Sequence, residues 1–242
     1  MEEEWFKNWF DTTYYHTLYQ NRNDDEAKIF IENLLRFLSP KKNAQFLDIA
    51  CGKGRHANQI QTHAHLVTGY DLSEESIEEA KKMERLGLSF YVHDMRNLFR
   101  TNYFDYALNL FTSFGYFNTA RDEQNAISSA SKSLKKGGVF TLDFLNKHKV
   151  TSTLIPQETK TIDGITFHIT RFIKNNRVHK QINFFADGQE NQYTEKVKLL
   201  TLSDFEKYFS FAGLEIKHVF GDYDLSPYIE TSNRLILIAT KK

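Results

Sequence analysis

The spacing of apolar residues predicts two helices at the start of the chain. From Trp5 to Tyr19, aromatic residues recur every three to five positions, which predicts one helix with a wide apolar face. From 24 to 38 the apolar residues follow the helical period more regularly. Asp24 or Asp25 is the expected N-cap of this second helix, and Ser39-Pro40 ends it.

Beyond residue 44, short apolar runs alternate with helical patterns. Strands are expected at 45–50, 66–71, 88–93, 104–110 and 138–145, and helices at roughly 53–64, 73–86 and 120–135. Ser73 is a suitable N-cap for the second of these helices, and Lys135-Lys136-Gly137-Gly138 is a suitable end for the third. Such alternation is typical of right-handed βαβ units whose parallel sheet carries helices on both faces.

After Asn146 the pattern becomes antiparallel. Residues 156–200 read as a β meander with turns at Asp163-Gly164, Asn175-Asn176 and Asp187-Gly188. No linker or repeat separates this segment from its neighbours, so we expect one α/β domain that carries a β insertion.

The last part of the chain returns to a helix followed by strands. Ser203 and Glu206 have the spacing of a capping box, and Gly213 ends the predicted helix. Two final strands, 214–220 and 233–240, are close enough in sequence to form an antiparallel pair at a sheet edge.

Composition narrows the range of functions. The 242 residues are 40% hydrophobic and 26% charged, as in a globular protein. Lys+Arg and Asp+Glu both number 31, so neither nucleic acid nor a membrane surface is an expected partner. The aliphatic run Leu235–Ala239 is too short to span a bilayer, and the acidic start does not resemble a secretory signal. The lone Cys51 fits a reducing cytoplasm, which is the expected location.

Residues 46–57 hold the most informative motif. An apolar run carries Asp48 near its end, passes through a small-residue turn and becomes helical. Gly52 and Gly54 let a ligand approach the backbone and the free N–H groups of the following helix. A carboxylate at Asp48 suits a cationic amine better than a phosphate, which it would repel.

Acidic residues also follow the next two predicted strands. Asp71 comes about 20 residues after the glycine turn, the distance at which an acid reaches a ribose diol. Asp94 occupies the equivalent place after the third strand. Any one of these acids alone is equally consistent with a ligand-binding role and with a structural role as a turn former or a helix cap. The three acids together, Asp48, Asp71 and Asp94, lie in register and indicate a nucleoside-cofactor site at the carboxyl edge of the sheet.

A dinucleotide is the rival cofactor, because Gly52–Ala57 also satisfies the G-x-G-x-x-G/A pattern of NAD(P) enzymes. Asp48 would then lie beside the pyrophosphate. The final strand pair also replaces the second mononucleotide-binding half that such enzymes have. Both features favour a cofactor with an amine.

The chain is similar to class I S-adenosylmethionine-dependent methyltransferases of the small bacterial type with a β insertion. The motifs that carry this resemblance span about residues 46 to 145, and the strands of 214–240 match the family's ending; they are Leu47–His56, Tyr70–Ser73, His93–Met95, Phe104–Asn109 and Leu134–Gly138. Ala50 departs from the family pattern, which often has glycine there. We expect alanine to require only a negative φ at this position.

The resemblance implies an α/β fold: a Rossmann-like seven-stranded methyltransferase sheet with an antiparallel C-terminal strand pair, an N-terminal helical lid and a small antiparallel β insertion. The implied units are a helical cap at 1–40, a core at 41–146 and 203–242, and the insertion at 147–202.

The resemblance also assigns residues to the cofactor, S-adenosylmethionine. Asp48 and the backbone at Ala50 and Gly52 would hold its methionine part, and Asp71 its ribose. The full expected set is Tyr15, Asp48, Ala50, Gly52, Gly54, Arg55, Asp71, Leu72, Asp94, Met95, Asn109, Leu110 and Phe111. Tyr14 and Tyr15 are both candidates for a phenol on the lid, although packing against the sheet is an alternative role for this helix.

Residues expected at the acceptor pocket are Phe114, Tyr116, Arg171 and Tyr228, with Phe117 a weaker candidate. No metal site is expected, because the nine histidines lack metal-ligand spacing. No catalytic residue is assigned, since displacement at a sulfonium needs mainly positioning and exclusion of water. His56 or His93 is a candidate base, with a structural role as the alternative.

The sequence therefore predicts an S-adenosylmethionine-dependent methyltransferase that acts on a small-molecule acceptor by in-line displacement. The alternatives are an NAD(P)-dependent oxidoreductase and a catalytically silent module that binds S-adenosylmethionine. The sequence predicts neither the acceptor's identity nor the oligomeric state.

Overall fold

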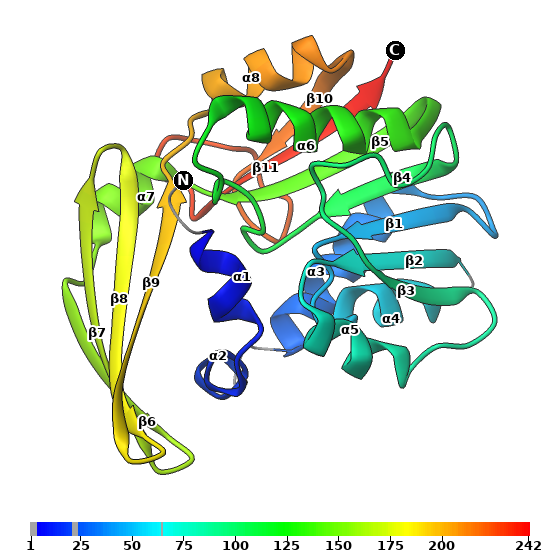
Figure 1. Ribbon diagram of the computed structural model, residues 1–242. Coiled ribbons are helices and arrows are strands. Elements are labelled where there is room, and N and C mark those ends of the chain that lie inside the picture. The colour runs from blue at the N-terminus through cyan, green and yellow to red at the C-terminus, as the bar shows by residue number, and fades with distance from the viewer. Residues whose placement is uncertain (1–3, 21–23, 64) are drawn as a thin grey trace.

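The computed structural model describes residues 4–20, 24–63 and 65–242, without the side chains of residue 7 and residues 24–26. Its main feature is a seven-stranded sheet with the order β10-β11-β5-β4-β1-β2-β3 (Figure 1). The strands are β1 (Gln45–Ile49), β2 (Leu66–Asp71), β3 (Leu88–Val92), β4 (Phe104–Asn109), β5 (Leu134–Leu145), β10 (Leu214–Phe220) and β11 (Arg234–Lys241). The predicted fold class is confirmed, including the antiparallel pairing of β10 with β11.

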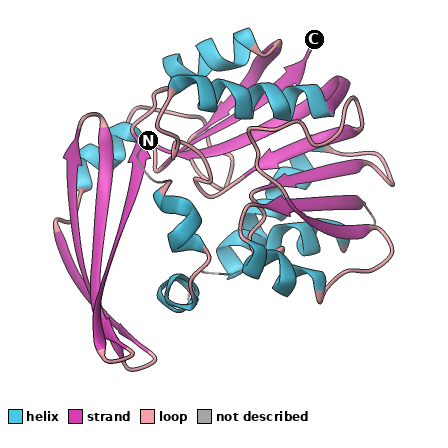
Figure 2. Ribbon diagram, in the orientation of Figure 1, coloured by secondary structure: helices cyan, strands magenta, loops and turns pink. Residues whose placement is uncertain are grey.

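Helices cover both faces of this sheet (Figure 2). The helices on one face are α3 (Asp24–Leu38), α4 (Arg55–Gln61) and α5 (Glu74–Lys81), and those on the other are α6 (Ala120–Ser133) and α8 (Leu202–Phe211). Side chains of β1 alternate between the two cores: Phe46 packs with the first group of helices and Leu47 with the second.

The register of the sheet brings the carboxyl ends of its central strands together. β1 pairs in parallel with β2 on one side and with β4 on the other. The chain order therefore reverses between β1 and β4, and a crevice opens beyond the strand ends at such a point. The glycine turn that follows β1 lies at this crevice.

The insertion forms a second, four-stranded antiparallel sheet in the order β6-β7-β8-β9. Its strands are β6 (Gln157–Ile162), β7 (Ile165–Lys174), β8 (Arg177–Ala186) and β9 (Gln189–Lys198), preceded by the short helix α7 (Lys147–Thr153), which the pattern did not predict. All three predicted turns are confirmed, and the first turn residues Asp163, Asn175 and Asp187 have positive φ angles.

The N-terminal segment contains two helices and not the single one predicted. They are α1 (Trp5–Phe10) and α2 (Thr13–Tyr19). Thr12 has an extended backbone, and its side chain accepts a hydrogen bond from the N–H of Tyr15, so it caps α2 and breaks the helix. α1 and α2 lie between the insertion and the large sheet (Figure 1), and Trp9 and Leu18 pack against the insertion.

Several predicted helix ends need correction. The capping box of α8 is formed by Thr201 and Asp204, two residues before the predicted pair. α6 ends at Ser133 and leads directly into β5, so Lys135–Gly138 is a bulge within a strand and not a helix stop. The predicted cap at Asp24 or Asp25 involves side chains outside the described set. No helix in the described ranges is long and apolar enough to cross a membrane.

The corrected capping box can be tested by stability. We expect Thr201→Ala to lower the free energy of unfolding by about 1 kcal/mol, because the N–H of Asp204 loses its side-chain acceptor. Ser203→Ala, at an exposed position within the helix, is the matched control and should change it by less than about 0.5 kcal/mol. Urea titration measures both values, and a larger loss for Ser203→Ala would contradict this cap assignment.

Candidate functional site

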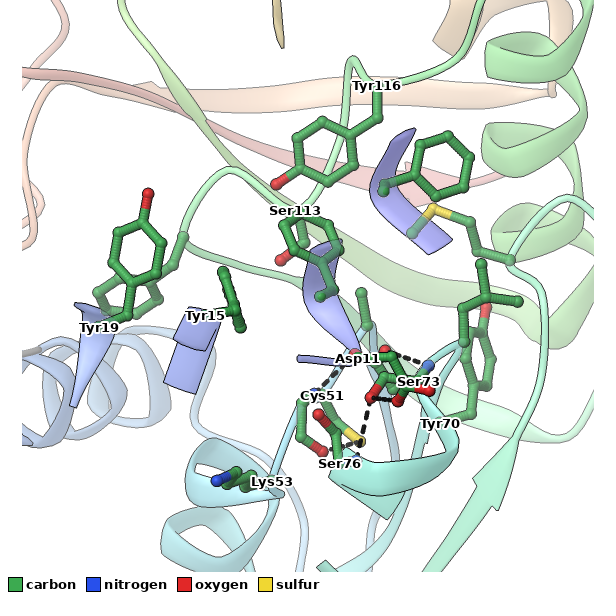
Figure 3. Close-up of a pocket in the computed structure, with 18 of the residues that line it drawn as sticks. Asp11, Tyr15, Tyr19, Cys51, Lys53, Tyr70, Ser73, Ser76, Ser113 and Tyr116 are labelled. Carbon is green, nitrogen blue, oxygen red and sulfur yellow. Dashed lines mark hydrogen bonds between the residues drawn. The ribbon is translucent and has the colours of Figure 1, made fainter. Parts of the chain in front are cut away.

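A cavity of about 670 Å³ lies where the carboxyl edge of the large sheet meets α1, α2 and β9. Figure 3 shows side chains around it from the N-terminal segment, the turn after β1, the end of β2 and the loop after β4. Three predicted acids line it, Asp48, Asp71 and Asp94. Its other predicted lining residues are Tyr15, Ala50, Gly52, Arg55, Leu72, Met95, Leu110, Phe111 and Tyr116.

The turn after β1 is left-handed at alternate residues. Ala50, Gly52 and Gly54 have φ angles of 57°, 53° and 79°. The expectation that Ala50 needs only a negative φ is therefore wrong, which explains why glycine suits this position. The turn is held by the N–H of Cys51, which donates to the carbonyl of Tyr70 at 2.9 Å.

The two glycines of the turn have different roles. A Cβ on Gly52 would meet no atom within 4 Å, so its backbone faces open space at the cavity. A Cβ on Gly54 would lie 2.5 Å from the ring of Phe90. Gly54 does not line the cavity, so the structure favours packing and the start of α4 as its role.

Asp48 combines deep burial with an unsatisfied oxygen. The residue is 1% exposed, and among the described residues its Oδ2 has no hydrogen-bond partner. Burial raises its pKa to about 7, against the opposing effects of the Ala57 N–H and Arg55. A cationic amine in the cavity would supply the missing donor and favour the charged carboxylate.

Asp71 and Asp94 are already anchored by the protein. Asp71 accepts hydrogen bonds from the N–H groups of Gly52 at 2.8 Å and Ser73 at 3.0 Å, which fixes both of its oxygens at the cavity wall. Burial raises the pKa of Asp71 despite these bonds. Asp94 pairs with Arg96 at 2.5 Å, and Arg96 also pairs with Glu4 just before α1.

The N-terminal helices are tied to the cavity at further points that the sequence pattern missed. Asp11 accepts hydrogen bonds from the Ser73 hydroxyl at 2.7 Å and the Glu75 N–H at 3.1 Å, and Figure 3 shows Asp11 beside Ser73. These bonds hold the α1–α2 junction over the ends of β2 and α5. α1 and α2 thus form a lid over this edge of the sheet.

Aromatic rings form a continuous wall at the other end of the cavity. Tyr19 and Phe10 each lie 4.9 Å from Tyr15, and Phe10 also contacts Tyr116, which in turn contacts Trp5. Figure 3 shows Tyr15 and Tyr19 side by side on one side of the cavity and Tyr116 above Ser113. This wall is the apolar part of the site.

Glu195 of β9 is the acid at this aromatic end. Its Oε1 accepts hydrogen bonds from Trp9 at 2.8 Å and Tyr19 at 2.6 Å. Its Oε2 lies 3.8 Å from the ammonium of Lys180, beyond hydrogen-bond distance. Because Glu195 lies more than 140 residues after β1 in the sequence, no local motif indicates its place here.

Some predicted site residues lie outside the cavity lining. The Asn109 side chain donates to the carbonyls of Ile49 and Ser113, so it ties β1 to the loop after β4. Phe114 is buried, whereas the weaker candidate Phe117 lines the cavity.

The remaining predictions of this kind fall on other surfaces. Arg171 pairs with Glu158 on the insertion at 2.5 Å. Tyr228 packs near β10, and its N–H donates to the carbonyl of Val219. Tyr14 donates to Asp187 in the β8–β9 turn, so of the two lid tyrosines only Tyr15 lines the cavity.

Three histidines line the cavity. His56 stacks on Phe111 at 4.8 Å, and His93 contacts the carbonyl of Asn97 at 2.9 Å. His16 was not predicted; burial and the charge of Lys53 lower its pKa to about 4, so it is neutral at pH 7. Among the side chains that the structure describes, no three acidic, histidine or cysteine residues form a metal-binding group.

Comparison with known proteins gives one consistent result. A family described as a methyltransferase domain matches residues 40–198. The chain is 26% identical to dTDP-3-amino-3,4,6-trideoxy-alpha-D-glucopyranose N,N-dimethyltransferase of Streptomyces venezuelae, over 86% of this chain and 91% of that protein.

Two solved structures have the same fold. A S-adenosylmethionine-dependent methyltransferase from Clostridium acetobutylicum is 22% identical, with a TM-score of 0.79 over 94% of this chain and 96% of that one. CalS10, an amino pentose methyltransferase from Micromonospora echinaspora solved with its cofactor bound, is 20% identical, with a TM-score of 0.73 over 96% and 98% of the two chains.

The buried carboxylate of Asp48 predicts a specific dependence of stability on pH. Its pKa of about 7 lies above the unfolded value of 3.8, so the folded state holds the proton more tightly. Its contribution to stability is present at low pH and is lost as the pH rises through 7. Between pH 5 and pH 8 the unliganded protein should lose roughly 2 to 3 kcal/mol through this group.

Asp48→Asn is the matched variant, because it keeps the shape and removes the titration. Between pH 5 and pH 8, the free energy of unfolding of Asp48→Asn should fall by roughly 2 to 3 kcal/mol less than that of the unchanged protein. Urea titrations without ligand measure both values. The other buried acids are present in both proteins, so their effect on the pH dependence of stability cancels in the comparison. Equal pH dependence in the two proteins would show that Asp48 does not have the raised pKa.

Proposed function

The chain belongs to the methyltransferase domain family and is a class I S-adenosylmethionine-dependent methyltransferase, and we propose that its acceptor is the amino group of a small molecule. One observation carries the proposal. The cavity joins a cofactor end, with Asp48 and Asp71, to an aromatic end that contains the carboxylate of Glu195.

The residues at the cofactor end fit S-adenosylmethionine. Its amine would meet the unpartnered oxygen of Asp48, and its ribose hydroxyls would meet Asp71. Leu72 and Met95 would pack on the adenine, with Asp94 near its amino group. Bound there, the cofactor supplies an electrophilic methyl group on a sulfonium. The NAD(P) alternative is disfavoured, because a pyrophosphate would place more negative charge near these acids.

The aromatic end is suited to a cationic amine. Ring faces attract cations, and the aromatic wall carries Tyr15 and Tyr116. The ring of Tyr19 already holds the ammonium of Lys180. Glu195 lies in the same lining. Its Oε2 pairs with the ammonium of Lys180 at 3.8 Å, a distance that leaves this oxygen able to accept a hydrogen bond. We propose that Glu195 binds the protonated amine. The amine must lose a proton before its nitrogen lone pair can attack the methyl carbon, and Glu195 receives that proton or passes it on. The bound cofactor would supply the methyl carbon, and its sulfur would keep the electrons of the broken carbon–sulfur bond.

The relatives support an amine acceptor in the amino-sugar class. The Streptomyces venezuelae relative is named for an amino sugar linked to dTDP, and CalS10 is named for an amino pentose. Enclosure of the cavity by the lid and β9 also favours a small molecule over a polymer. The lid excludes water, which the displacement requires.

The same proposal includes the organisation of the chain. We assign the cap at 1–40 and the insertion at 147–202 the task of closing the acceptor end of the core at 41–146 and 203–242. A cytoplasmic location is part of it, because the only cysteine is buried beside the cofactor turn and reduced.

The acceptor class is tested by paired substrates. We expect S-adenosylhomocysteine to form with a dTDP-linked 3-amino sugar and not with the corresponding 3-hydroxy sugar, as measured by mass spectrometry of both products. Glu195→Gln should raise the KM for the amine by roughly 10- to 150-fold, since hydrogen bonds to charged groups contribute about 1.5 to 3 kcal/mol, and should leave the affinity for S-adenosylhomocysteine unchanged.

Glu190→Gln is the control, because Glu190 is an exposed acid on the same strand. Its KM should equal that of the unchanged protein. Turnover of the hydroxyl sugar alone would overturn the amine assignment, and equal KM values for the Glu195 and Glu190 variants would overturn the role of Glu195.

A further inference from the structure

The loop after β4 holds two successive residues in a strained backbone conformation. Phe111 and Thr112 have φ angles of 54° and 63°. The left-handed region lowers the population of a residue with a Cβ by about fivefold to thirtyfold. Pairs of such residues persist only where surrounding contacts fix them, and they gather at functional sites. Phe111 lines the cavity described above.

A buried ion pair behind the cavity supplies these contacts. Asp143 of β5 accepts a hydrogen bond from the Phe111 N–H through Oδ2 at 2.8 Å, and its carbonyl accepts one from the Thr112 N–H at 3.1 Å. Arg234, the first residue of β11, donates through Nε to Asp143 Oδ1 and through Nη2 to the Thr112 hydroxyl, both at 2.8 Å. Three of these four bonds end on Phe111 or Thr112, and the fourth joins Arg234 to Asp143.

The position of this pair argues against a role in stability alone. The side chain of Asp143 is completely buried and that of Arg234 is 18% exposed. Neither residue lines the cavity. Burying two charges costs about as much as their attraction returns, and apolar residues of similar size are often at least as stable. What the pair provides that apolar residues cannot is a set of directed hydrogen bonds to the loop.

The loop in turn places two parts of the site. The Phe111 ring stacks on His56, and the guanidinium of Arg55 lies 5.6 Å from its centre. The carbonyl of Thr112 accepts a hydrogen bond from the Tyr116 hydroxyl. Tyr116 contacts Trp5 of α1 at 5.4 Å, so the loop is also where the lid rests.

We propose that Asp143 and Arg234 are positioning residues for methyl transfer: they hold Phe111 and Thr112 left-handed and so fix the cavity wall and the resting place of the lid. The proposal rests on the proposed function, because Phe111 lines the same cavity. A displacement reaction is sensitive to such placement, since an error of about 1 Å can cost about a hundredfold in rate.

The test compares Arg234→Gln with Arg234→Gln/Thr112→Gly. Glycine adopts the left-handed region without the penalty, so it should replace part of what the ion pair does. We expect Arg234→Gln to speed amide exchange at Phe111 and Thr112 by about tenfold or more and to lower kcat by about 10- to 100-fold. KM for the amine and the affinity for S-adenosylhomocysteine should change by less than about threefold. The double variant should regain at least about fivefold in kcat.

Arg85→Gln is the matched control, because Arg85 bonds to Asn58 and Gln61 on α4 and does not line the cavity. It should leave exchange in the loop and kcat unchanged. If Arg234→Gln does not fold, Arg234→Lys carries the same test, since it keeps the charge beside Asp143 and loses the fork that reaches Thr112.

Two results would overturn the proposal. One is a folded Arg234 variant with unchanged amide exchange at Phe111 and Thr112. The other is a folded double variant that regains no activity. Failure of every amine to react would count against the proposed acceptor only, because the exchange measurement needs neither substrate nor turnover.

Discussion

The cavity depends on one costly arrangement, a carboxylate buried near the end of a central parallel strand. β1 has a hydrogen-bonded neighbour on each side, and Asp48 is therefore withdrawn from water with one oxygen unpartnered among the described residues. Such a group costs free energy unless a ligand supplies a donor and a positive charge. In the proposed binding mode the amine of S-adenosylmethionine supplies both, so the burial that destabilises the unliganded protein would favour binding of the cofactor.

Strained backbone surrounds this site on both sides of the point where the strand order reverses. Ala50 and Gly52 are left-handed after β1, and Phe111 and Thr112 are left-handed after β4. Hydrogen bonds from neighbouring strands hold each turn, through Tyr70 and Asp71 in the first case and through Asp143 in the second. Ala50, Gly52 and Phe111 of these two turns line one cavity, so rigid sheet elements set the distance between them.

The sequence predicted the strands of the large sheet, the glycine turn and the insertion, because these depend on local periodicity and turn chemistry. The three acids were found for the same reason, since parallel strands bring their ends together. Errors arose where tertiary contacts decide. Thr12 breaks the first helix so that Asp11 can reach α5, and the left-handed φ of Ala50 follows from the pairing of Cys51 with Tyr70.

Residues at the acceptor end were the least predictable. Glu195 reaches the site because the insertion packs on the lid, and no short-range pattern reports such packing. Tyr14 and Tyr15 are adjacent in sequence, yet the helical turn sends one to the insertion and the other to the cavity. Arg171 does not line the cavity, because its guanidinium pairs with Glu158 within the insertion sheet. Burial and pairing of this kind emerge only from the assembled fold.

We propose that the cofactor's amine donates a hydrogen bond and supplies a positive charge to the buried carboxylate of Asp48. The most direct measurement is a carbon-13 NMR titration of the Asp48 carboxyl, without ligand and with S-adenosylhomocysteine bound. We expect the pKa of Asp48 to be near 7 in the free protein and to fall by more than about two pH units on binding, because a bound cation favours the charged form. An Asp48 pKa that ligand binding leaves unchanged would contradict it.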